Sequence, residues 1–283
     1  MKRILALLLA CMMIVSLVAL TGCRKDDNET VNIPGATEGE SDRPDNLAEK
    51  HGVKPMKDGK LVIGLEATYE PFEMMGEDGS FVGYDVDLAY ELGDLLGLEV
   101  QFINTGFDGI LDGIDVNYDC VISALTVNDE RKEQVLFTDS YIENYQAVVV
   151  KKDVEIDIMS FEDLNGSKIA LQEGTTSNDL MDSLIEDGVL DASIIANPYI
   201  GVCFDSMKNG EIDYVVCDSS VAYARLAKEP DDFRIAWVDD SNPEVFAVAV
   251  GKENTALADA MNEALAILKD EGFFEENGER WFA

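Results

Sequence analysis

Short apolar, β-branched runs alternate with amphipathic helical patterns from residue 61 to the end of the chain. The runs predict strands at 61–65, 99–103, 119–122, 146–150, 168–171, 212–217 and 245–250. Between them, apolar residues at helical spacing predict helices at 85–96, 176–187, 219–227 and 255–269. Alternation of this kind is typical of α/β folds built around largely parallel sheets. The sequence therefore predicts an α/β protein.

The N-terminus has the pattern of an export signal. A basic head, Lys2 and Arg3, precedes an apolar stretch at 4–20. A stretch of this length could also remain as a membrane-spanning helix. Small residues before Cys23 and polar residues after it resemble the lipobox of bacterial lipoproteins. That resemblance implies a signal peptide at 1–22, a lipidated Cys23 carrying palmitate or a similar acyl chain, and an extracytoplasmic protein held to the cell membrane by its anchor.

The segment after Cys23 is rich in charge, Pro and Gly and nearly free of aromatic residues. Such a segment cannot bury enough apolar surface to offset the entropy of ordering it. We therefore expect residues 23–60 to form a lipidated flexible tether. The remainder, 61–283, is long enough for two hydrophobic cores.

Charge and residue content exclude several functions. Against 57 Asp and Glu residues the chain has 21 Lys and Arg, for a formal net charge of -36, so nucleic acid is not an expected partner. The single histidine, His51, lies in the predicted tether, which excludes His-based zinc sites and Ser-His-Asp nucleophile systems. No phosphate-binding or dinucleotide motif occurs. We expect no cofactor, no metal and no catalytic residue, and these features favour binding over catalysis.

Three cysteines, Cys120, Cys203 and Cys217, belong to the predicted folded part. Two of them lie in apolar strand-like runs, where a buried thiol behaves as a small hydrophobe. We expect free thiols, and a disulfide between Cys203 and Cys217 is the alternative.

The segment from Gly83 to Leu88 matches the signature of the polar amino-acid family of periplasmic solute-binding proteins. Further segments resemble the family's ligand loops and second-lobe markers, at 65–72, 122–131, 161–166 and 172–176. The resemblance covers 61–283. It implies a type II periplasmic-binding-protein fold with two lobes joined by two β-strand crossings. The first lobe takes 61–145 and 246–283, and the second takes 146–245.

The same resemblance implies a function. The protein would bind a free polar amino acid outside the cytoplasm and deliver it, as a monomer, to the permease of an ABC-type importer. Two alternatives remain on this fold. One is a dehydratase-like enzyme, which an intact set of amino-acid-binding residues disfavours. The other is a sensory domain, which would need a membrane helix and a signalling module after Ala283.

The resemblance also implies how the amino-acid head group is held. Arg131 and Thr126 match the residues that bind the α-carboxylate, and Thr176 begins a helix whose N-terminus favours an anion. Asp218 matches the acid that binds the α-ammonium. The structural alternatives are a surface Arg131 paired with a neighbouring acid, an N-cap at Thr176, and a helix-capping Asp218.

The rest of the predicted site surrounds the ligand's side chain. Ser123 and Ala124 would face the cleft with backbone groups, and Tyr69 and Phe107 match the family's aromatic walls. Glu66 lies where binders of basic amino acids place an acid, which suits a cationic ligand. Alternatively, Glu66 bonds groups of its own loop, and glutamine or cystine would fit equally well.

Overall fold

The computed structural model describes residues 46–282, so the predicted signal peptide and Cys23 lie outside the described part. The elements in chain order are α1 (Leu47–His51), β1 (Lys60–Leu65), β2 (Thr68–Tyr69), β3 (Glu73–Met75), β4 (Phe81–Val82), α2 (Tyr84–Leu96), β5 (Glu99–Asn104), the 3-10 helix η1 (Ile110–Gly113), β6 (Cys120–Val121), α3 (Asp129–Gln134), β7 (Val135–Lys151), the 3-10 helix η2 (Phe161–Leu164), β8 (Lys168–Gln172), α4 (Thr176–Glu186), β9 (Ser193–Asn197), α5 (Ile200–Lys208), β10 (Tyr214–Asp218), α6 (Ser219–Lys228), β11 (Phe233–Gly251), α7 (Thr255–Asp270) and α8 (Phe273–Phe282).

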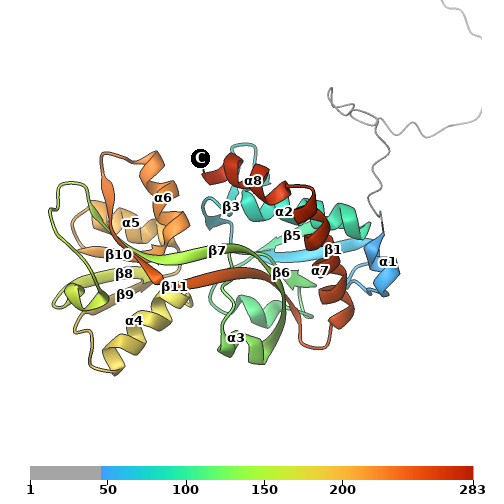
Figure 1. The fold of residues 1–283 in the computed structure, drawn as a ribbon, viewed down its shortest axis with the longest axis horizontal. Coiled ribbons are helices and arrows are strands. Elements are labelled where there is room, and N and C mark those ends of the chain that lie inside the picture. The colour runs from blue at the N-terminus through green and yellow to red at the C-terminus, as the bar shows by residue number, and fades with distance from the viewer. Residues whose placement is uncertain (1–45, 283) are drawn as a thin grey trace, which may run out of the picture. The chain divides into compact units, whose positions relative to one another are not determined.

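One sheet connects both halves of this part of the chain. Its strand order is β5-β1-β6-β11-β7-β10-β8-β9. The outer strands are parallel on each side, and only β7 and β11 run antiparallel to their neighbours. We call the part around β5, β1 and β6 the first lobe and the part around β10, β8 and β9 the second lobe. Figure 1 shows β7 and β11 running side by side from one lobe to the other. The predicted α/β, two-lobed fold with two strand crossings is confirmed.

The two crossing strands are much longer than the sequence indicated. β7 begins eleven residues before the expected 146, and β11 begins twelve before the expected 245. Polar and charged residues interrupt the apolar pattern where the strands leave the cores, which is why only their buried ends were predicted. The expected lobe boundaries, 145/146 and 245/246, fall inside these strands and stay predictions.

Helices α2 and α7 cover the first lobe through the apolar faces expected of them, and their buried residues join one core cluster with β1. Gly83 precedes α2 with a φ of 140°, and a Cβ there would lie 2.0 Å from the Phe72 carbonyl oxygen. Only glycine fits so close to another backbone segment. The second lobe has its own apolar cluster around β8, β10 and α4.

The segment before β1 corrects the expected tether. Residues 46–60 include α1, which is capped by the Asn46 side chain and ends at Gly52. Leu47 is fully buried in the first-lobe core, and Ala48 is buried beside it. Burial of these two apolar side chains stabilises a short helix in an otherwise polar segment. The fold therefore begins before residue 61.

The three cysteines of the folded part are free and buried, as expected. Cys120 lies in β6, Cys203 in α5 and Cys217 in β10. The Cys203 thiol donates to the Leu171 carbonyl at 3.2 Å. Within residues 46–282, no helix is long and apolar enough to cross a membrane.

Candidate functional site

The two lobes meet through polar side chains beside the crossing strands. Hydrogen bonds and ion pairs between them include Tyr69 with Asp218, Glu66 with Gln172, Glu70 with Lys228, and Arg131 with the Gly174 carbonyl. A further residue, Glu244 of β11, bonds Thr126 of the first lobe and Thr176 of the second. The contact zone contains most of the residues that the sequence placed in the ligand site.

Arg131 is buried where α3 meets the second lobe, with 8% of its surface exposed. The Asn128 side chain caps α3 by accepting a hydrogen bond from the Arg131 backbone, which fixes the arginine in the first turn. Its guanidinium donates to the Thr126 carbonyl at 2.8 Å and to the Gly174 carbonyl at 3.1 Å. Among residues 46–282 it has no ion-pair partner, so the alternative of a surface Arg131 paired with a neighbouring acid is not what the structure shows. A buried cation that forms no direct ion pair is suited to an anionic ligand.

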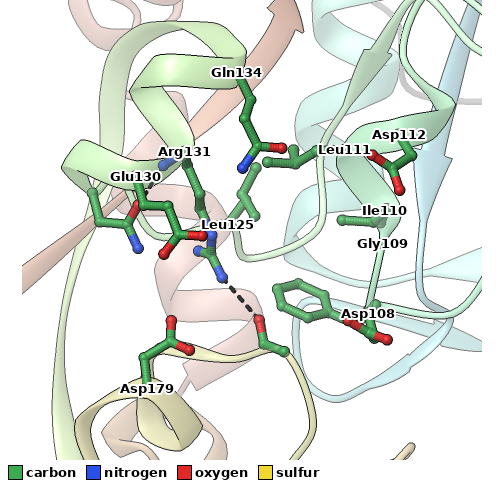
Figure 2. A pocket seen from close by; sticks show the side chains of 13 residues that line it. Asp108, Gly109, Ile110, Leu111, Asp112, Leu125, Glu130, Arg131, Gln134 and Asp179 are labelled. Atoms are coloured by element: carbon green, nitrogen blue, oxygen red, sulfur yellow. Dashed lines mark hydrogen bonds between the residues drawn. The ribbon is translucent and has the colours of Figure 1, made fainter. Parts of the chain in front are cut away.

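A cavity of about 290 Å³ opens beside Arg131. Figure 2 shows Asp108 and Asp112 on one wall, with Glu130 and Asp179 on the arginine's side. The Phe107 ring, 9% exposed, also lines the cavity, and its centroid lies 5.7 Å from the guanidinium carbon. Phe107 therefore packs against Arg131, as a cation–π partner. The cavity does not reach Asp218 or Glu66, which the lobes enclose more tightly.

Asp218 ends β10 at the centre of the contact zone. Tyr69 donates its hydroxyl to one carboxylate oxygen, and Asn144 and Gln146 donate to the other at 2.6 and 3.4 Å. The side chain forms no capping bond to α6, so the helix-cap alternative does not describe it. Burial raises the pKa of Asp218 to about 7, and the nearby Glu244 carboxylate adds to the shift. Tyr69 reaches Asp218 across the lobes, so this aromatic side chain touches the predicted ammonium site directly.

Glu66, 1% exposed, follows β1 and touches the second lobe. Thr68 of its own loop donates to one oxygen at 2.5 Å, and Gln172 donates to the other at 3.1 Å. Burial raises the pKa of Glu66, and these hydrogen bonds oppose the increase. All of these donors are neutral, so the described residues leave its charge without a cation.

Two buried acids, Glu73 and Asp85, accept hydrogen bonds from the loop of Ser123 and Ala124. The Ser123 hydroxyl donates to Glu73 at 2.7 Å and accepts from the Glu66 backbone at 3.0 Å. Ala124 has a φ of 44°, which is unusual for a residue other than glycine, and its N–H donates to Asp85 at 2.7 Å. The Ser123 side chain is thus used inside the first lobe, which leaves backbone groups for the cleft.

Thr126 and Thr176 lie on opposite lobes with their hydroxyls on one carboxylate oxygen of Glu244, each at 3.0 Å. The N-cap of α4 is Thr175, whose side chain accepts from the Asn178 backbone. The expected N-cap role of Thr176 is therefore wrong by one residue, because Thr175 already has the extended backbone that a cap requires. The Thr176 side chain is left for the cleft.

Besides the Glu70–Lys228 ion pair, sequence reasoning missed four polar residues of the contact zone, which are Asn144, Gln146, Gln172 and Glu244. Two of them lie on β7, which the sequence interpretation treated only as a crossing strand. Gln172 immediately follows the predicted strand at 168–171. Glu244 lies just before the predicted strand at 245–250, after Pro243, outside the predicted elements. Polar residues at strand ends that face a predicted cleft were the signal that could have found them.

The fold and the contact zone define a two-lobed protein of the periplasmic-binding type, with a polar cleft crossed by two strands. The chain belongs to the bacterial extracellular solute-binding proteins, family 3, which it matches over residues 61–283. This match confirms the resemblance seen in the sequence.

Three sets of relatives are similar to this chain. The ABC transporter arginine-binding protein 1 of Escherichia coli K12 is 33% identical over 228 residues, which cover 79% of this chain and 90% of that protein. An ancestral arginine-binding protein, solved with arginine and with glutamine, is 36% identical with a TM-score of 0.73, covering 80% and 99% of the two chains. An ancestral amino acid-binding protein described as a precursor of cyclohexadienyl dehydratase is 33% identical with a TM-score of 0.74, covering 84% and 99%.

Proposed function

We propose that this protein binds a free polar amino acid outside the cytoplasm and delivers it to the permease of an ABC-type importer, and that Arg131 and Asp218 hold the two ends of the amino-acid head group. Thr126 and Thr176 support the carboxylate beside Arg131. Backbone groups at Ser123 and Ala124 face the ligand, and Tyr69 and Phe107 form the walls of the site.

The observation that carries this proposal is a pair of buried, opposite charges, neither of which forms an ion pair. Among residues 46–282, no carboxylate lies within ion-pair distance of Arg131 and no cation within that distance of Asp218, although both are almost fully buried. Burying an uncompensated charge is costly. A zwitterion supplies one carboxylate and one ammonium, so a single amino-acid ligand compensates both residues at once.

The charge of the cleft favours a ligand with a basic side chain. Apart from Glu244 and the Glu70–Lys228 ion pair, two carboxylates, those of Glu66 and Asp218, share the contact zone with one arginine. The α-ammonium of a neutral amino acid compensates only one of them. A second positive charge near Glu66 would compensate another, which suits arginine, lysine, ornithine or histidine. Glutamine and cystine are the neutral alternatives, and they fit if Glu66 keeps its bonds to Thr68 and Gln172.

A thermal-shift screen tests the function. The purified protein is heated with each of the twenty amino acids, with ornithine and with cystine. A ligand that binds only the folded state stabilises it by about 2.7 kcal/mol at a hundredfold excess over its Kd. We expect a clear increase in Tm with one amino acid or one chemical class. No increase with any of them would contradict the proposal.

Calorimetry tests the assignment of the two charges. Removing one partner of a buried ion pair costs about 3 to 5 kcal/mol, so Arg131→Ala or Asp218→Ala should weaken binding by two decades or more. Lys132→Ala is the matched control, because Lys132 is the exposed neighbour of Arg131 in α3. Near-native affinity in a folded Arg131 or Asp218 variant removes that residue from the site.

The lipid anchor at Cys23 and the boundaries of the two lobes are further parts of this proposal. Lipidation at Cys23 would hold the protein at the membrane surface, close to its permease, while residues between Cys23 and α1 act as the tether. The lobes would move as units of 61–145 with 246–283 and of 146–245. We also propose that the protein works as a monomer.

We propose binding without turnover. A relative described as a precursor of a dehydratase makes the enzymatic alternative specific. Asp218 and Glu66 could act as acids on such a substrate, but Asp218 is committed to three hydrogen-bond donors. Incubation with prephenate-like acids separates the two functions. Formation of a dehydrated product would identify an enzyme, and unchanged acid supports a binding protein.

A further inference from the structure

Glu244 lies at a break in the pairing of the two crossing strands. The register of β11 against β7 shifts between Asp239 and Glu244, and Glu244 pairs with Asn144. Its half-buried carboxylate turns into the cleft. One oxygen accepts hydrogen bonds from Thr126 and Thr176, and the other accepts from Gln146 at 3.2 Å.

These contacts use the donors that a ligand's carboxylate needs. A threonine hydroxyl has one proton to donate. In the structure, the hydroxyls of Thr126 and Thr176 both donate to the same oxygen of Glu244, with each Oγ1 3.0 Å from Oε2. A ligand carboxylate at these hydroxyls and beside Arg131 would also meet the negative charge of Glu244 at close range, which is unfavourable in a buried site. The two carboxylates cannot occupy this place together.

We propose that Glu244 is a competitor of the ligand within the chain, whose carboxylate uses the same hydroxyl donors as the ligand's carboxylate and must move out before the amino acid binds. The inference rests on the proposed amino-acid-binding function. Glu244 is partly exposed and lies at the register shift of β11, so its side chain has a route toward solvent. Because it bonds Thr126 of one lobe and Thr176 of the other, it also links the two lobes.

Affinity measurements test the competition. L-arginine and L-glutamine are titrated calorimetrically into the wild type, Glu244→Gln and Glu244→Ala. Ligand binding must break the hydrogen bonds that the Glu244 carboxylate accepts, which weakens binding to the wild type. We expect both variants to bind the probes about tenfold more tightly than the wild type. Glu143→Gln is the control, since Glu143 pairs with Val245 on the same strand crossing and is exposed to solvent.

Weaker binding in both variants would overturn the proposal, because Glu244 would then be contacting the ligand's ammonium. Unchanged binding would overturn it as well. Glu244→Gln keeps the size of the side chain, so it provides the result if Glu244→Ala is poorly folded.

Small-angle X-ray scattering of the ligand-free proteins separates this inference from the proposed function. Loss of the bridge should increase the radius of gyration of Glu244→Ala above that of the wild type, whether or not any amino acid binds. An identical radius in the two proteins contradicts the bridging role. A wild type that binds neither probe nor any other amino acid would instead contradict the proposed function.

Discussion

Asp218 is buried, lies near the like-charged Glu244 and accepts hydrogen bonds from three neutral donors. Its carboxylate is the predicted partner of the ligand's ammonium, and it must be ionised to serve as one. Burial and the Glu244 carboxylate raise the pKa of Asp218 to about 7, while Tyr69, Asn144 and Arg131 oppose the shift. In the ligand-free protein Asp218 therefore titrates near neutral pH.

The titration of Asp218 predicts a pH dependence of binding. A carboxyl with a raised pKa is protonated below that pKa, so affinity should fall as the pH decreases from 8 to 5. With a pKa of about 7, only about one molecule in a hundred is ionised at pH 5, and affinity should fall about a hundredfold. Calorimetry in two buffers of different ionisation enthalpy should detect proton release on binding near pH 6. Binding that is independent of pH in the wild type contradicts the assignment.

We propose that Glu66 determines which class of amino acid binds. We expect Glu66→Gln to weaken the binding of arginine or lysine by at least about tenfold, because a buried charge pair is lost, while any weak binding of glutamine holds or improves. Competition titrations with arginine, lysine and glutamine measure the ranking. An unchanged ranking would show that Glu66 accepts hydrogen bonds from Thr68 and Gln172 but does not select the ligand.

Helix α2 contributes to the site through its first turn. Asp85, at the second position of α2, accepts from the Ala124 backbone and from the Tyr141 hydroxyl. It thereby holds Ala124 in its left-handed conformation at the edge of the cleft. Within the Gly83–Leu88 segment, Asp85 thus supports the loop of Ser123 and Ala124.

The buried Asp85 predicts how stability depends on pH. Burial raises its pKa to about 7, and Glu73 beside it is also shifted upward. A carboxyl with a raised pKa contributes stability at low pH, which is lost as the pH rises from about 4 to 7. We expect the ligand-free protein to lose up to about 4 kcal/mol over this range from Asp85, at about 1.4 kcal/mol per pKa unit.

Urea unfolding at pH 5 and pH 8 measures this loss. Asn at position 85 can still accept from Ala124 and Tyr141 but cannot ionise. Asp85→Asn should therefore show a smaller difference between the two pH values than the wild type. An equal difference in both proteins would assign the pH dependence to other buried acids such as Asp218.

The elements that the sequence predicted well are those with a clear apolar period, such as α2 and α7. Elements whose contacts are mostly polar are harder to predict from the sequence. The long ends of β7 and β11 carry Asn144 and Glu244, which the sequence pattern does not place in strands, because polar residues interrupt the apolar period there. Arg131 could be proposed because it belongs to a recognisable segment of the family, and Asp218 because it follows a predicted strand at the position of the family's acid. Glu244 could not, since its role depends on two threonines far away in the sequence.

At the scale of the whole molecule, a two-lobed binding domain is joined to an N-terminal segment that ends in α1. Leu47 and Ala48 fix the start of the fold against the first lobe. Any tether to the membrane must therefore end before residue 46. With the proposed anchor at Cys23, the residues between Cys23 and this point would set the distance that the domain can reach from the membrane.

The predicted anchor can be tested in cells. Cys23 lies outside the described residues, and its lipidation is proposed from the sequence around it. Replacing Cys23 with Ser should move the protein from the membrane fraction to the soluble fraction after export, because a single acylated residue supplies the attachment. Fractionation and immunoblotting measure the distribution. A processed Cys23→Ser protein that stays with membranes shows that another feature holds it.

The three buried thiols give each lobe its own chemical reporter. A thiol labels only as a solvated thiolate, and burial raises the pKa of Cys120, Cys203 and Cys217 alike. Their alkylation rates therefore follow how often the surrounding structure opens, rather than how the lobes turn about the crossing strands. Cys120 records opening of the first lobe, while Cys203 and Cys217 record opening of the second. The alkylation rates of the native cysteines therefore report how often each lobe unfolds.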